Sequence, residues 1–143
     1  MIIEALVRTV HLIGALGVGL SVLLLVLASR DLSPEDLAGV RRIYLALLVA
    51  LGVTALAGVA LWLWVGKPAT FFSQNPVFHA KLSLFALVIL MLAWPAWYFY
   101  RHSTEGPTGP ASALVRRLLG ATLPLLVLIP VLAYLMARGI GYG

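Results

Sequence analysis

Two histidines and two cationic side chains stand where long apolar segments begin, and their types suit the binding of a metal cofactor. His11 lies in the first apolar segment, close to Arg8, and His79 opens the third segment, close to Lys81. Neutral imidazole nitrogens are ligands of haem iron, and cations pair with carboxylates such as haem propionates. Ionisable groups are unfavourable in a membrane, so each is a candidate functional residue. We predict His11 and His79 as metal ligands, with Lys81 and Arg8 as further cofactor-binding residues.

Continuous apolar segments must position these side chains. The chain has 143 residues, of which 62% are hydrophobic and 10% are charged, and its mean hydropathy is +1.05. Apolar runs cover residues 5–28, 43–65, 77–100 and 118–137, each close to the roughly 20 residues that a spanning helix needs. The runs do not alternate with polar residues, which argues against a β-barrel. We predict an all-α, integral membrane four-helix bundle, one domain over residues 1–143, whose first segment is retained rather than removed as a signal peptide.

Composition excludes several classes of function. The chain has no cysteine, which excludes iron–sulfur clusters, disulfides and covalently attached c-type haem, and leaves b-type haem as the candidate. The net charge is +5 and the pI about 10.1. Because the cations are dispersed at the ends of the apolar runs, lipid headgroups are their expected counterions and nucleic acid is not an expected partner.

The distribution of cations predicts how the chain threads the membrane. Six of the ten cations lie in the first and third connections, at Arg30, Arg41, Arg42, Arg101, Arg116 and Arg117. The positive-inside rule then puts both termini on the extracytoplasmic side of a bacterial inner (cytoplasmic) membrane, in a multi-pass protein. This threading brings His11, His79 and Lys81 towards the same, outer leaflet.

Helical phase predicts which of these side chains faces inward. His79 shares a stripe of mostly small residues with Ser83, Ala86, Leu90 and Ala93, whereas Lys81 shares a stripe with Leu84, Phe85, Val88 and Leu92. Small residues allow helices to approach closely, so the His79 stripe is the expected bundle face. We therefore expect His79 to meet His11 inside the bundle and Lys81 to reach for the interface.

Local signals mark the ends of the helices. Asn75-Pro76 reads as the cap and first residue of the third helix, and Ser33-Pro34-Glu35-Asp36 as the start of the second. Gly106, Pro107, Gly109 and Pro110 indicate a turn before the fourth helix. His102 is interpreted as a headgroup contact, and the aromatic residues near both interfaces as membrane anchors.

The stretch "VGKPATFFSQNPVFHAKLSLFALVIL", residues 65–90, resembles the DUF2214 family of uncharacterised four-span bacterial membrane proteins. More distantly, "RTVHLIGALGVG" and "FHAKLSLFALVIL" are similar to the first and third spans of HemJ-type protoporphyrinogen oxidases and of CopD-like copper-resistance proteins. The HemJ-type resemblance implies a site associated with b-type haem at His11 and Lys81. The sequence departs from that family after His11, at Leu12, Ile13 and Gly14, and in "LVLASRD" at the end of the first span.

Several hypotheses follow. The leading one is a protein that holds b-type haem between the first and third helices near the outer leaflet and transfers electrons, with quinone or a respiratory complex as candidate partner. The alternatives are a non-catalytic accessory or structural subunit, a homo-oligomer joined through small residues such as Gly17 and Ser21, and a HemJ-like oxidase. His11 and His79 could also serve another metal or a proton transfer. In the simplest interpretation, His79 is an interfacial residue and His11 hydrogen-bonds a neighbouring backbone or threonine.

Overall fold

The chain forms four long helices and one short helix. The structure, a computed structural model, describes residues 1–32, 36–101 and 111–141. The long helices are α1 (Ile2–Ala28), α2 (Asp36–Leu63), α4 (Pro76–Arg101) and α5 (Ala113–Ala137), and α3 (Ala69–Ser73) connects α2 to α4. Each long helix is long and apolar enough to cross a membrane. The predicted all-α bundle of four apolar helices is confirmed, and the chain is a multi-pass membrane protein.

Three of the predicted local features fall outside the described residues. They are the cap at Ser33-Pro34-Glu35, the headgroup contact of His102, and the turn that contains Gly106, Pro107, Gly109 and Pro110.

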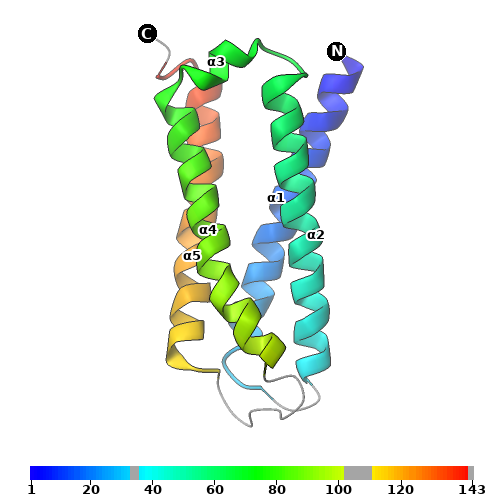
Figure 1. The fold of residues 1–143 in the computed structure, drawn as a ribbon, viewed down its shortest axis with the longest axis vertical. Coiled ribbons are helices and arrows are strands. Elements are labelled where there is room, and N and C mark those ends of the chain that lie inside the picture. Colours follow the sequence, from blue (N-terminus) through cyan, green and yellow to red (C-terminus); the bar gives the residue numbers. More distant parts are fainter. Residues whose placement is uncertain (33–35, 102–110, 142–143) are drawn as a thin grey trace.

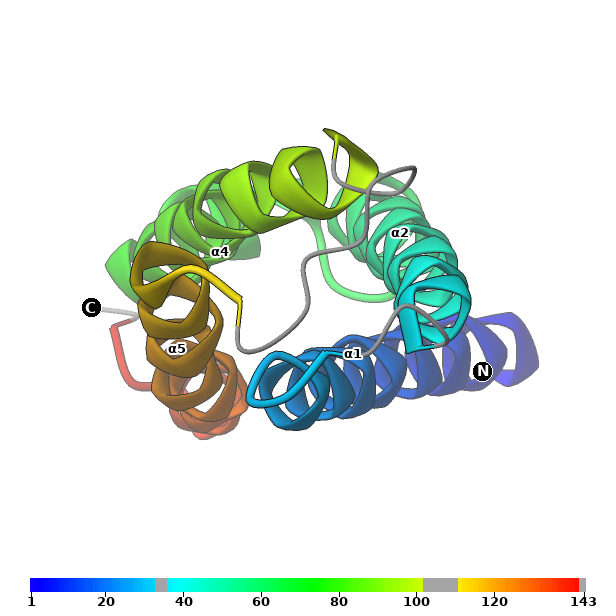
Figure 2. The same ribbon diagram turned by 90° about the horizontal axis from the view of Figure 1, so that it is seen from below.

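The helices surround a common axis in two closely packed pairs. α1 packs chiefly against α2 and α4 against α5, while α1 also touches α5 and only a small contact joins α2 to α4. Figure 2 shows this ring of helices from one end. In Figure 1 the N-terminal residue, α3 and the C-terminal end of α5 lie together at what we call the terminal end. The other end is called the opposite end. Which side of the membrane each end faces stays a prediction.

Glycines bring α1 and α2 close together. A β-carbon on Gly14 would lie 2.5 Å from Oγ1 of Thr54, and one on Gly17 would lie 3.2 Å from Cβ of Ala50. Ser21, one turn beyond Gly17, is also buried. Without a side chain, the glycines allow the two backbones to approach. The Gly17 and Ser21 pair, considered above as a contact between copies, therefore serves packing inside one chain.

The packed hydrophobic core lies towards the opposite end. Its buried members include the following residues from all four long helices: Val18, Val22, Leu25, Val40, Leu47, Val88, Leu92, Val115 and Leu119. At this end the backbone N–H of Ala111 also donates to the carbonyl of Ser29, at 3.1 Å, which fixes the start of α5 beside the end of α1. The terminal half of the bundle is less filled by apolar side chains, and the candidate site lies there.

The start of α4 is fixed by a buried asparagine. Oδ1 of Asn75 accepts a hydrogen bond from the backbone N–H of Val77 at 2.8 Å, and Nδ2 donates to the carbonyl of Ile140 at 3.3 Å. Asn75 has no exposed surface. The predicted cap at Asn75-Pro76 is confirmed. Because the same side chain holds the segment after α5, it places the first turns of α4 beneath α3.

Candidate functional site

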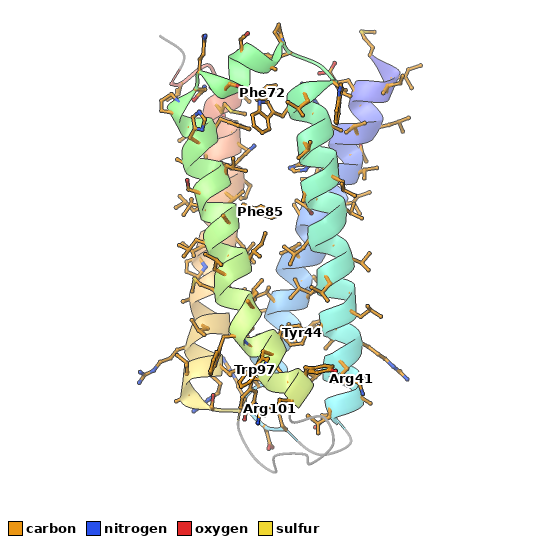
Figure 3. All side chains as sticks on the ribbon, in the orientation of Figure 1. Arg41, Tyr44, Phe72, Phe85, Trp97 and Arg101 are labelled. Carbon is orange, nitrogen blue, oxygen red and sulfur yellow. The ribbon has the colours of Figure 1, made fainter. Side chains whose placement is uncertain are left out.

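A cavity of about 330 Å³ lies at the terminal end, between the long helices and under α3. Its polar lining comes from three parts of the chain: Arg8 and His11 of α1, Lys67 before α3, and Lys81 of α4. Its apolar lining includes Trp62, Phe71, Phe72, Phe78 and Met136. Figure 3 labels Phe72 at this end of the bundle. We call this space the terminal cavity.

His11 lies on the inward face of α1, with one ring nitrogen fixed by α2. Its Nδ1 is 2.9 Å from the carbonyl oxygen of Thr54. A carbonyl only accepts, so Nδ1 carries the hydrogen, and in the neutral ring Nε2 then keeps its lone pair. Among the described residues, Nε2 has no hydrogen-bond partner. A metal-ligating histidine usually donates its other N–H to such a carbonyl or to a carboxylate, which holds the ring in the ligating tautomer.

Gly58 provides the space for this ring. A β-carbon on Gly58 would lie 3.1 Å from Cε1 of His11. On α1, His11 follows the same inward stripe as the buried residues Gly14 and Val18. The simplest interpretation, a hydrogen bond from His11 to a neighbouring backbone, is confirmed. Ligation of haem by His11 stays a prediction.

Lys81 faces the bundle and His79 does not, which corrects the phase prediction. Lys81 lines the terminal cavity and is half-buried, whereas His79 is exposed and its Nε2 lies 2.8 Å from the carbonyl oxygen of Ser73. The rest of the His79 stripe, at Ser83, Ala86 and Ala93, is exposed as well, and so is Leu90 between them. The structure therefore brings His11, Lys81 and Arg8 to one cavity and leaves His79 outside its lining.

The phase prediction was wrong because it applied the small-residue rule to the wrong helix face. Small residues favour an interface only where two backbones approach closely, as α1 and α2 do. The inward face of α4 looks across a wider interior, which needs large side chains, and Phe85, Val88 and Leu92 supply them. Lys81 belongs to that bulky stripe.

Arg8 lies at the edge of the cavity and is partly neutralised. It forms an ion pair with Glu4, one turn earlier on α1, and its side chain is 58% exposed. Glu4 also lies beside Gly66, whose φ of +93° suits glycine. An exposed i,i+4 pair of this kind contributes little to stability. The guanidinium of Arg8 therefore remains available to a second anion.

Aromatic rings form the roof and wall of the cavity. The Trp62 indole N–H donates to Oγ of Ser73 at 3.0 Å, which ties α2 to α3. The Trp62 and Phe78 ring centroids are 5.1 Å apart, and those of Phe72 and Phe78 are 5.8 Å apart. Nζ of Lys67 lies 3.8 Å from the centroid of Phe71. The sequence predicts Phe71 and Phe72 as membrane anchors, whereas here they belong to the roof. Trp64 and Tyr134, 76% and 57% exposed, suit the role of anchors at this end.

The charges of the cavity are unbalanced. Three cations, Arg8, Lys67 and Lys81, line it, and no acidic residue of the described chain belongs to the lining. Aromatic and aliphatic side chains make up the remainder. Such a site suits a molecule with an apolar body and carboxylate or phosphate groups at its edge.

A family model with the description "Predicted membrane protein (DUF2214)" matches residues 3–141. The chain belongs to the DUF2214 family. The resemblance stated above for residues 65–90 thus extends over nearly all of this DUF2214 protein. Comparisons with curated proteins and with solved structures find no match for it. The more distant resemblance to HemJ-type and CopD-like proteins stays a prediction, and a function for this DUF2214 protein has to be argued from the terminal cavity.

Proposed function

We propose that this membrane protein binds b-type haem in the terminal cavity, with His11 as the protein ligand of the iron, and takes part in electron transfer. The observation that carries the proposal is the state of His11. Its Nδ1 is held by the Thr54 carbonyl at 2.9 Å, and its Nε2 is left without a partner among the described residues, beside a basic and aromatic cavity. Haem, when bound, would supply a one-electron couple.

The other lining residues suit the two ends of such a cofactor. Lys81 and Arg8, with Lys67 nearby, offer three cations for the propionates. Phe78, Trp62 and Met136 offer apolar contacts for the macrocycle. The cavity, at about 330 Å³, is small for a cofactor site. It would enclose only part of a porphyrin unless α3 moved, which would break the hydrogen bond from Trp62 to Ser73 and the contact of Phe72 with Phe78.

One histidine, rather than two, is proposed as the axial ligand. The sequence suggested His11 and His79 together, but His79 is exposed and bonded to Ser73 outside the cavity lining. His11 would then be the single protein group that holds the haem iron. Such a haem would react with small external ligands more readily than a bis-histidine haem, which is an additional way to test the proposal.

The direct test is titration of the purified protein with haem in lipid nanodiscs. We expect a saturable Soret band at one haem per chain, and a further shift of the band when imidazole or cyanide is added. Lys81→Met should weaken the binding by roughly tenfold, because a buried charge-assisted contact is lost. Absence of a saturable band in the wild-type protein would overturn the proposal.

A non-catalytic role in a membrane assembly is the second candidate, and the outer face of α4 favours it. Ser83, Ala86 and Ala93 form an exposed stripe of small residues there, of the kind that membrane helices use to associate. Ala86→Leu should then change the oligomeric state or partner content in mild detergent, while Leu87→Ala, on a neighbouring exposed face, should not.

A HemJ-like oxidase activity rests on the resemblance at His11 and Lys81. Its substrate is also an apolar macrocycle with carboxylates, so the same cavity would serve it. Restoration of haem synthesis in cells that lack their own oxidase would support this activity, and failure of the well-expressed protein to restore it would exclude it.

A further inference from the structure

A second hollow lies at the opposite end of the bundle, between α2 and α4. It has a volume of about 710 Å³ and lies where these two helices have little contact with each other. Arg41, Arg42, Tyr44 and Leu48 of α2 line one side, and Trp97 and Tyr100 of α4 line the other. Figure 3 labels Arg41, Tyr44, Trp97 and Arg101 at this end of the bundle. We call this hollow the lateral groove.

Tyr44 has a buried hydroxyl group without a partner. The residue is only 8% exposed, and its ring packs against Phe99 with centroids 5.6 Å apart. Its hydroxyl is the one buried side-chain polar atom of the described residues that has no hydrogen bond. Buried hydroxyl groups in native proteins are nearly always hydrogen-bonded. Tyr44 also lines the lateral groove, so a molecule bound there that displaces the side chains covering the hydroxyl and offers an oxygen acceptor would satisfy it.

Two arginines line the same groove as Tyr44. Arg41 and Arg42 are exposed, and neither makes an ion pair with a described residue. A third guanidinium, that of Arg101 on α4, lies 5.4 Å from the ring centroid of Trp97. The groove therefore presents unpaired positive charge at its end and an unsatisfied donor just inside.

The order of groups along α2 matches the order of groups in a phospholipid. Arg41, Tyr44 and Leu48 are spaced i, i+3 and i+7, so they share one helix face and rise towards the middle of the bundle. At about 1.5 Å per residue, Leu48 lies roughly 10 Å beyond Arg41. A phospholipid has its phosphate, ester oxygens and acyl chain in the same order, from the headgroup towards the middle of the membrane. Leu45, 64% exposed, and Leu48, 59% exposed, leave the apolar part open for an acyl chain.

We propose that the lateral groove is a binding site for an anionic phospholipid. The phosphate lies at Arg41 and Arg42, the Tyr44 hydroxyl donates to a phosphate or ester oxygen, and an acyl chain lies against Leu45 and Leu48. Basic hollows between membrane helices are suited to anionic headgroups. The buried hydroxyl distinguishes this site from the general attraction between any surface cation and an anionic leaflet.

The chain provides a matched control for that distinction. Arg116 and Arg117 are also adjacent, exposed arginines at the opposite end, but they belong to α5 and do not line the groove. Replacing them removes the same amount of charge from the same end of the protein. Tyr44→Phe keeps the ring and its packing on Phe99 and removes only the hydroxyl.

The test is native mass spectrometry of the full chain with phosphatidylglycerol or phosphatidylcholine added in detergent. We expect one phosphatidylglycerol to be retained per chain. The double variant Arg41→Gln, Arg42→Gln should weaken it by roughly tenfold or more, and Tyr44→Phe by roughly fivefold. The Arg116→Gln, Arg117→Gln variant should retain it as the wild type does.

Three results would overturn the proposal. The first is equal loss in the two double-arginine variants, which would mean general surface attraction. The second is unchanged binding in Tyr44→Phe. The third is retention of phosphatidylcholine equal to that of phosphatidylglycerol. Occupation of the groove by a helix of another protein would overturn the proposal as well. Because the readout needs no haem, it is independent of the terminal cavity.

Discussion

The ionisable side chains at the two ends of the bundle face in opposite directions. At the opposite end a packed apolar core fills the interior, and Arg41, Arg42, Arg116 and Arg117 lie outside it, where headgroups can reach them. At the terminal end Lys81 and His11 point into the bundle, under an aromatic roof. A charge that faces the interior has to be balanced by something held there, whereas a charge that faces outward is balanced by lipid. For this reason our proposal places the cofactor at the terminal end, where the inward-facing cation and histidine lie.

The close contact of α1 with α2 is where the terminal cavity is most easily destroyed. Gly14→Leu places a side chain against Thr54, whose Oγ1 already lies 2.5 Å from the position of a β-carbon. We expect loss of most of the folded protein, because the backbones would have to separate and the Thr54 carbonyl would move away from His11. The measurement is the monodisperse yield after detergent extraction. Gly19→Leu is the control, since nothing lies within 4 Å of a β-carbon there; equal losses in both variants would contradict this account.

The helix caps of the two ends should differ in strength. Asn75→Ala removes a fully buried side chain that accepts from the N–H of Val77 and donates to the carbonyl of Ile140, so we expect a loss of about 2 kcal/mol in the free energy of unfolding. Ser112 caps α5 at the opposite end, with Oγ 3.3 Å from the N–H of Val115, but it is exposed. Ser112→Ala should cost about 0.5–1 kcal/mol. Thermal unfolding in one detergent compares them, and a larger effect at Ser112 would reverse the expected order.

Gly58→Ala tests whether the position of the His11 ring matters for the cofactor. The added methyl group would lie 3.1 Å from Cε1, so the ring would have to shift by a few tenths of an ångström on α2. We expect haem affinity to fall by roughly tenfold, as is usual when the support of a metal-ligating histidine is disturbed. Gly52→Ala, where a β-carbon meets nothing within 4 Å, should bind haem as the wild type does. Unchanged haem affinity in Gly58→Ala would show that binding does not depend on the position of the His11 ring.

The smallest effect is expected for the ion pair at the edge of the cavity. Glu4→Gln removes the partner of Arg8. Because the pair is partly exposed, the free energy of unfolding should change by less than about 0.5 kcal/mol. The same change frees the Arg8 guanidinium and should leave haem affinity equal or slightly higher. A marked loss of affinity in a haem titration would show that Glu4 itself supports the site.

How much of this could be predicted from the sequence depends on the feature. Continuous apolar runs and the Asn75-Pro76 cap predicted the four helices and the start of α4, because hydrophobic length and cap chemistry are local properties. The face of α4 that points into the bundle was predicted wrongly. Lipid is as apolar as the interior of the bundle, and both faces of α4 carry apolar residues. The short helix α3, its aromatic roof and the buried Tyr44 hydroxyl depend on contacts between distant segments, so no local pattern indicated them.

The central claim is that His11 holds the cofactor and His79 does not, and parallel haem spectra of two variants test it most directly. His11→Ala and His79→Ala would be purified with the wild type from cells supplied with haem precursor, and circular dichroism would verify that each is folded. The account predicts that the Soret band disappears in His11→Ala and persists in His79→Ala. A band that survives loss of His11, or one that disappears only with loss of His79, would contradict it.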